Sequence, residues 1–227
     1  ADYGVIIGYK KNVDNYTILR FPSRCTKIAT KYSDDLYKDY EDNESIIRSY
    51  TKNIMKVEMP DTITELGYGA FSAYSPIGQY SYQYGFYFSS LERVELSKSL
   101  SKIEDYAFSV CENLKYIEIP ENVTEIGADA FSGCEKLNIE IPDNITKIGS
   151  GAFSSCNAIE SITIPKSVKT IDECAFGGWS SKQTIKCKAT EAGENWNEYW
   201  NYEWAAFQGG YIKSSCNIIW GYQDSNT

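Results

Sequence analysis

Four glutamates are the carboxylates whose spacing could support chemistry, because they recur in short, similar stretches of the chain. These are Glu58 in "VEMP", Glu95 in "VELS", and Glu118 and Glu140 in two copies of "IEIP". A pair of carboxylates can act as the acid and the base of a glycosidase. That role needs a pocket that raises the pKa of one carboxyl group. Corresponding residues of neighbouring strands instead lie about 5 Å apart on one flat face. The glutamates therefore predict a charged surface and not a catalytic pair.

The residues that usually activate a nucleophile or bind zinc are missing. The chain has no histidine, which excludes Ser-His-Asp and Cys-His catalysis and the common zinc sites. Its seven cysteines form no Cys-x-x-Cys pair, so a thioredoxin-like or zinc-ribbon site is not expected. Cys111, Cys134 and Cys156 recur with a repeat and predict a buried ladder of thiols, whereas Cys187 and Cys216 could pair in an oxidising compartment. We predict a protein that is not an enzyme and has no cofactor and no metal.

Charge and hydrophobicity limit the partners of the chain. Its formal net charge is −9 and no basic cluster stands out, so binding of nucleic acid is not expected. The sequence contains no run of eighteen apolar residues, so membrane insertion is not expected either. It begins with neither Met nor an apolar secretory segment, and we therefore expect a processed or trimmed piece. We expect it to act as a monomer.

Copies of one repeat must position the four glutamates. Four stretches align along nearly their whole length, at 94–116, 117–138, 139–161 and 162–184, while an earlier copy starts at Val57 and a degenerate one, "LRFPSRCTKI", spans 19–28. A phenylalanine recurs in the repeat at spacings of 37, 23, 22 and 23 residues. Its members are Phe71, Phe108, Phe131, Phe153 and Phe176. A period of about 23 residues lies within the range of leucine-rich repeats.

Each repeat predicts two short strands and a turn. "L-x-x-I-x-I-P" alternates and then ends at a proline, which cannot donate to a continuing ladder. "V-T-E-I-G" predicts a second strand, and "A-F-S-G-C" a tight turn with its Ala, Phe and Cys directed inward. One repeat cannot bury its apolar side alone, but stacked neighbours can. The glutamates then form an outward column, and a second column two residues earlier contains Lys56, Arg93 and Tyr116.

These two columns predict where charge is left unbalanced. We expect Lys56 and Arg93 to neutralise Glu58 and Glu95, because they belong to the same repeats. Glu118 and Glu140 have no such neighbour in the earlier column, so a cation or a basic partner could bind there. The alternative is that all four are solvated charges on an exposed sheet, which contribute little energy.

The repeat resembles the BspA-like leucine-rich-repeat family, whose hallmark is "IP-x-x-V-x-x-IG-x-x-AF-x-x-C-x-x-L-x-x-I". The match is closest at 117–165 and good over 54–187. This resemblance implies a right-handed solenoid with a parallel sheet on its concave side and short strands and turns on its convex side. It also implies a secreted or cell-surface protein with an adhesive or partner-binding role and no catalytic residues. The sequence departs from the hallmark at Ser97, where proline is expected, and at Tyr74 and Trp179, where cysteine is expected.

Two insertions and a terminal segment interrupt this pattern. We predict a repeat array over 1–187, with a degenerate first repeat at 1–53 that carries an insertion at 29–53, and with an aromatic insertion at 75–88 within repeats 54–184. Ser33 predicts the start of a helix in the first insertion. Residues 188–227 are predicted to cap the array. Trp196, Trp200 and Trp204 lie there at i, i+4 and i+8, which predicts a helix with one apolar face.

The aromatic insertion is the second candidate contact surface. Tyr80, Tyr82, Tyr84 and Phe86 alternate with a period of two, which predicts a strand with one apolar face. The repeats already supply a core, so these rings are available to bind a partner. They could instead fold back on the flank together with the 29–53 insertion.

The sequence therefore predicts a non-enzymatic binding or adhesion module, extracellular or at a cell surface, that presents its concave sheet and aromatic insertion to a protein partner. A carbohydrate-binding module or a structural spacer without a ligand are the alternatives. The predicted partner-binding residues are Glu58, Glu95, Glu118, Glu140, Arg93, Tyr116, Tyr80, Tyr82, Tyr84 and Phe86.

Overall fold

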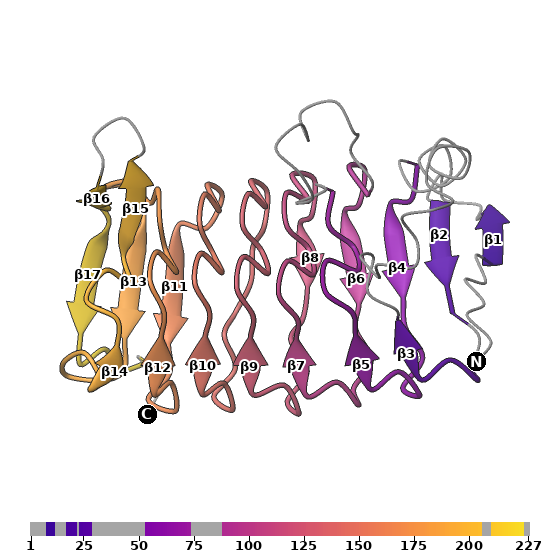
Figure 1. Cartoon of the computed structure of the whole chain (residues 1–227), viewed down its shortest axis with the longest axis horizontal. Helices are drawn as coiled ribbons and strands as arrows, with labels where there is room; N and C mark the ends of the chain where they lie inside the picture. Colours follow the sequence, from indigo (N-terminus) through magenta and orange to yellow (C-terminus); the bar gives the residue numbers. More distant parts are fainter. Residues whose placement is uncertain are drawn as a thin grey trace.

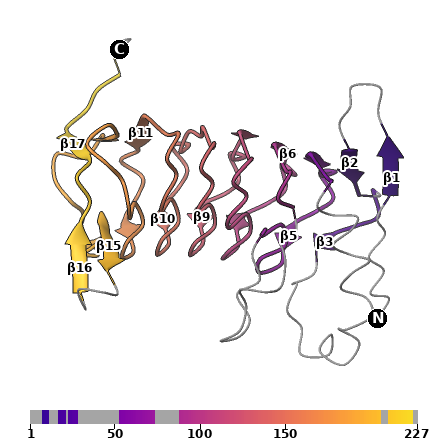
Figure 2. The same cartoon turned by 90° about the horizontal axis from the view of Figure 1, so that it is seen from above.

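The chain folds into a stack of similar coils along one axis (Figures 1 and 2). The computed structural model describes residues 8–11, 17–21, 23–28, 53–73, 88–205 and 210–224. Every regular element within these ranges is a β-strand. No helix in this part of the chain is long and apolar enough to cross a membrane.

One strand of each coil belongs to what we call the first layer. Its strands are β1 (Gly8–Lys11), β2 (Thr17–Arg20), β4 (Lys56–Glu58), β6 (Arg93–Glu95), β8 (Tyr116–Ile117), β11 (Ser161–Ile164), β13 (Thr184–Cys187) and β17 (Asn217–Trp220). β1 pairs antiparallel with β2, and the other pairs are parallel. An isolated parallel bridge joins Tyr116 to Asn138 beyond β8. The strands predicted at "L-x-x-I-x-I-P" are confirmed.

The second strand of each coil belongs to the second layer. Its members are β3 (Lys27–Ile28), β5 (Glu65–Leu66), β7 (Lys102–Ile103), β9 (Glu125–Ile126), β10 (Lys147–Ile148), β12 (Thr170–Ile171) and β14 (Asn195–Trp196). All of their pairings are parallel and in register, so that equivalent residues of successive repeats are neighbours. These are the predicted "V-T-E-I-G" strands. Turns connect the two layers at both edges of the stack (Figure 1).

The recurring phenylalanines form a continuous ring stack in the core. Phe71, Phe108, Phe131, Phe153 and Phe176 are all buried, and their ring centroids follow one another at 5.5, 5.6, 5.6 and 5.5 Å. The interplanar angles are 6°, 7°, 11° and 17°. A separation of this size is favourable for aromatic rings that are stacked with an offset. Each ring thus packs against the equivalent ring of the next coil.

A column of side-chain donors runs beside this stack. Each donor bonds the backbone carbonyl of the phenylalanine in the preceding coil: Cys111 to Phe71 (3.1 Å), Cys134 to Phe108 (3.1 Å), Cys156 to Phe131 (3.2 Å), Trp179 to Phe153 (2.9 Å) and Ser214 to Phe176 (3.2 Å). The predicted ladder of buried thiols is confirmed. Burial raises the pKa of Cys134 well above its usual value and that of Cys156 to about 12, so both thiols are protonated donors at neutral pH. Cys187 and Cys216 are free thiols in the structure.

Two of the three departures from the repeat hallmark can be described, since Tyr74 lies outside the described residues. Trp179 stands where cysteine is expected, and its indole N–H takes over the role of the thiol. Ser97 stands where proline is expected and is fully buried. Its hydroxyl donates to the carbonyl of Ile63 at 2.5 Å and accepts from the N–H of Ser99 at 3.2 Å. The Ser97 hydroxyl and the Trp179 indole N–H therefore both have hydrogen-bond partners within the core.

The helix predicted for Trp196, Trp200 and Trp204 is wrong. Trp196 lies in β14 opposite Ile171, and Trp200 lies in the following turn, where its carbonyl accepts from the N–H of Phe176 at 3.2 Å. A spacing of four residues also separates the inward isoleucine and alanine of a normal repeat, as in Ile171 and Ala175. The two tryptophans thus continue the repeat, and their spacing coincides with that of a helix.

The chain then forms a hairpin before it returns to the first layer. β15 (Tyr202–Ala205), which contains Trp204, pairs antiparallel with β16 (Gly210–Lys213). β17 follows and pairs parallel with β13. Trp200 packs edge-on against Phe176, with centroids 5.7 Å apart, and so covers the end of the ring stack.

Candidate partner-binding surface

The outward side chains of the first layer form one continuous surface. Along β6, for example, Val94 is buried between exposed Arg93 and Glu95. Strand register places Lys56 beside Arg93, and Glu58 beside Glu95. We call this the first-layer surface and define it by Arg20, Lys56, Glu58, Arg93, Glu95, Tyr116, Glu118, Asn138 and Glu140. This surface includes all six of the predicted binding residues that the structure describes.

The charges at the N-terminal end of this surface neutralise one another. Lys56 Nζ lies 2.7 Å from Glu58 Oε1 and 2.7 Å from Glu95 Oε1, while Arg93 Nε lies 3.6 Å from Glu95 Oε1. Arg20 adds a third cation, since its Nη2 donates to Glu58 Oε1 at 3.1 Å. The predicted neutralisation by Lys56 and Arg93 is confirmed.

Arg20 is the member of this surface that sequence reasoning missed. It lies in the degenerate copy "LRFP", at the position that Glu58 holds in "VEMP", and the strand register pairs the two. Alignment of that copy with the next one would have identified it. The Arg20 hydrogen bond is the main reason that the pKa of Glu58 lies below its usual value, and Lys56 adds to the effect, while burial opposes it.

This network predicts a pH-dependent contribution to stability. Because the pKa of Glu58 is lowered by folding, its contribution is present above about pH 4.5 and is lost as the pH falls through the folded value. We expect Glu58→Gln to reduce the free energy of unfolding by about 0.5–1 kcal/mol at pH 7, since the pair is partly exposed. Chemical denaturation at several pH values measures this difference. It should shrink toward pH 3, and also in about 1 M salt; a difference that stays constant would show that the ion pairs contribute nothing.

The next part of the surface has carboxylates without cations. Glu118 and Glu140 are both exposed, and neither forms an ion pair with any residue that the structure describes. Tyr116 lies beside them with 59% of its surface exposed, and Arg93 Cζ lies 5.9 Å from the centroid of its ring. Negative charge, an exposed aromatic ring and the Asn138 amide thus occur together on adjacent coils.

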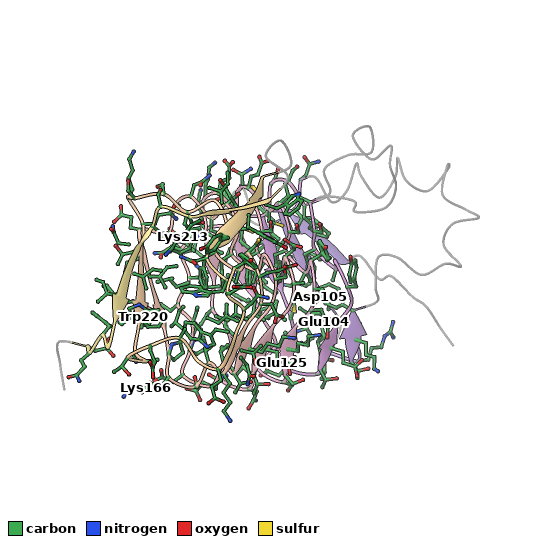
Figure 3. All side chains as sticks on the ribbon, turned by 60° about the vertical axis from the view of Figure 1, so that its left-hand side comes forward. Glu104, Asp105, Glu125, Lys166, Lys213 and Trp220 are labelled. Carbon is green, nitrogen blue, oxygen red and sulfur yellow. The ribbon has the colours of Figure 1, made fainter. Side chains whose placement is uncertain are left out.

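The second layer differs from the first in its charge pattern, because the outward charges of its described strands alternate in sign. Its outward column reads Lys27, Glu65, Lys102, Glu125 and Lys147 along the described strands. Ion pairs connect Lys27 to Glu65 (2.7 Å), Lys102 to Glu104 (2.9 Å) and Lys147 to Asp172 (3.3 Å). Glu104, Asp105 and Glu125 are labelled on this side in Figure 3. Register places Glu125 between Lys102 and Lys147, so the outward charges of the described strands alternate in this layer.

The aromatic insertion is not part of the surface that the structure describes. Tyr80, Tyr82, Tyr84 and Phe86 lie outside the described residues, as does the helix predicted to start at Ser33. Phe88, at the end of the insertion, is described and buried. Its ring packs edge-on against Phe71 with centroids 5.2 Å apart, so this residue belongs to the core.

Comparisons with known proteins agree with the geometry of the repeat. The BspA type leucine rich repeat region matches residues 77–196 in six copies. Among solved structures, the chain is similar to a leucine rich cell surface protein from Faecalibacterium prausnitzii A2-165, with 30% identity, coverage of 68% of this chain and 36% of that one, and a TM-score of 0.43. The chain thus spans little more than a third of the length of that protein. No curated protein matches its sequence.

Two further structures resemble the fold at lower identity. The leucine rich repeat protein of T. pallidum is 20% identical, with coverage of 84% of this chain and 80% of that one and a TM-score of 0.49. The pneumococcal vaccine antigen PcpA is 18% identical, with coverage of 89% of this chain and 40% of that one and a TM-score of 0.51. The likeness to PcpA supports the same fold.

Proposed function

Because the chain belongs to the BspA-type leucine-rich-repeat family, we propose that it is a non-enzymatic protein-binding module that acts extracellularly, at or near a cell surface. The fold repeats one short unit to build long, regular surfaces, which suits it to contact with another macromolecule. A solved relative is described as a cell surface protein, which supports this location. Fold alone does not identify a ligand, so the partner must be argued from the surface itself.

One observation carries the choice of surface. Glu118 and Glu140 lack cations among the described residues, whereas Glu58 and Glu95 on the same surface are neutralised by ion pairs. Carboxylates aligned on neighbouring strands repel one another unless a positive charge compensates them. We propose that a protein partner supplies this charge.

The chemistry around these carboxylates indicates what the partner presents. A lysine or arginine of the partner would pair with Glu118 or Glu140, and Tyr116 would offer a large, rigid contact beside them. Electrostatic complementarity of this kind affects the association rate and the choice of partner more than it affects affinity. The partner is therefore expected to have a basic patch.

Charge reversal tests this proposal. The intact chain is screened against purified extracellular proteins that range from acidic to basic, and against a glycan panel. We expect hits among the basic proteins, and we expect the double variant Glu118→Lys, Glu140→Lys to weaken them at least about tenfold, because two attractive contacts become repulsive. Surface plasmon resonance measures the affinities.

The control has the same change in net charge on another surface. Glu191 and Glu198 are exposed and lie in the segment after β13, so Glu191→Lys, Glu198→Lys should retain the hits. If both double variants weaken binding equally, the effect is one of net charge and the proposed surface is wrong. Binding confined to the glycan panel would also contradict the proposal.

The aromatic insertion provides a second arm of the same experiment. A variant with residues 75–87 shortened to the normal repeat length keeps Phe88, which the core requires. If this folded variant loses the hits while Glu118→Lys, Glu140→Lys retains them, then the insertion binds the partner and the first-layer surface does not. Loss in both variants would indicate that the two surfaces act together.

A further inference from the structure

A recess of about 620 Å³ lies at one edge of the stack, between the β15–β16 hairpin and the turns of the preceding coils. Figure 2 shows this hairpin on the side away from the first layer. The recess is therefore separate from the first-layer surface, and its function does not depend on the function proposed above. Its lining combines three carboxylates, from Asp129, Glu173 and Glu203, with the rings of Trp204 and Tyr211.

The three carboxylates come from three different coils and gather around Cys174. Burial is the main cause that raises the pKa of this thiol, and the negative charges of Glu173, Asp129 and Glu203 add to it. The thiol therefore remains neutral at physiological pH and adds no negative charge of its own. No lysine or arginine belongs to the lining of the recess in the part of the chain that the structure describes.

Glycine makes room for one of these carboxylates. A Cβ atom at Gly151 would lie 2.3 Å from Asp129 Oδ1, and the φ angle of Gly151 is +62°, which favours glycine. The turn residue thus lets the Asp129 carboxylate lie over the backbone of the next coil. Glu173 is held by the β15–β16 hairpin, since the hydroxyl of Tyr211 donates to its Oε2 at 2.7 Å.

An aromatic corner stands beside the carboxylates. Trp204 is 59% exposed, and its ring meets that of Tyr211 nearly at a right angle, with centroids 5.1 Å apart and an interplanar angle of 72°. The ring of Tyr199 stacks on that of Tyr211, with centroids 4.5 Å apart. The indole face of an exposed tryptophan is the best aromatic site for a cation.

We infer that this recess binds a cationic side chain, the lysine or arginine of a basic peptide segment. The carboxylates supply the charge, and the Trp204–Tyr211 corner supplies a surface for the aliphatic stem and the cationic head group. A metal ion fits the recess less well, because the described residues contain no group of three or more carboxylates or thiols arranged to hold one. The volume is sufficient for one long side chain and part of its backbone.

Isothermal titration of the full chain with an acetylated and amidated tetralysine peptide tests this inference. We expect saturable binding, and an affinity lowered about tenfold or more by Glu173→Gln, Glu203→Gln. We also expect Trp204→Ala to lower the affinity about threefold to tenfold, which is the range of a cation–π contact. This second variant leaves the net charge unchanged, and its side chain is exposed, so the fold does not depend on it.

Matched controls separate the recess from general attraction to an acidic protein. Glu121→Gln, Glu191→Gln removes the same charge from exposed positions outside both the recess and the first-layer surface, and should leave tetralysine binding within about twofold. A peptide with norleucine in place of lysine should not bind. The inference is overturned if Trp204→Ala binds tetralysine as tightly as the intact chain, or if Glu121→Gln, Glu191→Gln loses as much affinity as the recess variant. Failure of this test leaves the charge-reversal test above unaffected, because the two use different residues and different probes.

Discussion

Replacing Phe131 with alanine is expected to lower the free energy of unfolding by about 3–5 kcal/mol, the range for truncation of a buried phenylalanine. Phe131 is fully buried and stacks on Phe108 on one side and Phe153 on the other, with both centroids 5.6 Å away. Its removal leaves a cavity between two coils and breaks two ring contacts at once. Urea denaturation followed by circular dichroism measures the change.

A leucine at the same position provides the control for this prediction. Phe131→Leu keeps most of the apolar volume and loses only the ring stacking, so we expect a cost of about 1–2 kcal/mol. Stability in a stacked array depends on the interfaces between neighbouring repeats, so damage to a central coil affects both halves of the stack. A loss below about 1 kcal/mol for the alanine variant would contradict the continuous core described here.

Trp179→Ala is expected to cost about 3–5 kcal/mol, since a large buried side chain and its hydrogen bond are both lost. Trp179 is 2% exposed, packs edge-on against Phe176, and donates from Nε1 to the carbonyl of Phe153 at 2.9 Å. Trp179→Phe keeps much of the volume but removes the donor. We expect that variant to cost about 1–2 kcal/mol, the penalty for a buried carbonyl that loses a partner.

Thermal and urea unfolding of both variants measure these values, with Trp204→Ala as the reference. Trp204 is 59% exposed, so its replacement should change stability by no more than about 0.5 kcal/mol. If Trp179→Phe were as stable as the intact chain, the indole N–H would not carry the role that the thiols have in the other coils. The hydrogen bond from Trp179 to the carbonyl of Phe153 would then contribute nothing to stability.

The repeat could be predicted from the sequence because its period is regular. A residue such as Phe131 has the same neighbours in the adjacent coils as Phe153 has, so one physical reading of the unit applies to every copy. The outward glutamate column and its neutralisation by Lys56 and Arg93 followed from the same logic. Arg20 was missed only because its copy of the repeat is degenerate.

The C-terminal segment could not be predicted in this way. Trp196 and Trp200 are four residues apart, a spacing that fits both a helical face and the inward positions of a repeat. Only the pairing of β14 with β12 decides between them, and that pairing is a tertiary interaction. The recess was also hidden, since Asp129, Glu173 and Glu203 are far apart in the chain and meet Trp204 only through stacked turns and the β15–β16 hairpin.

The pattern of charge distinguishes the surfaces of the molecule more than the fold does. Both layers consist of similar short strands, but ion pairs and alternating signs balance the described part of the second layer. Glu118 and Glu140 leave the first layer with negative charge that the described residues do not offset. This difference is the basis for assigning the partner to one surface.

Hydroxyl-radical footprinting of the chain with a basic protein hit, alone and in complex, tests the central claim most directly. Tyr116 reports on the first-layer surface and Trp204 on the hairpin edge, and both side chains are 59% exposed in the free chain. The proposed function predicts that oxidation of Tyr116 falls at least about threefold in the complex, as expected for a ring at the centre of an interface. Unchanged oxidation of Tyr116 in a saturated complex would show that the partner binds elsewhere and would contradict the account.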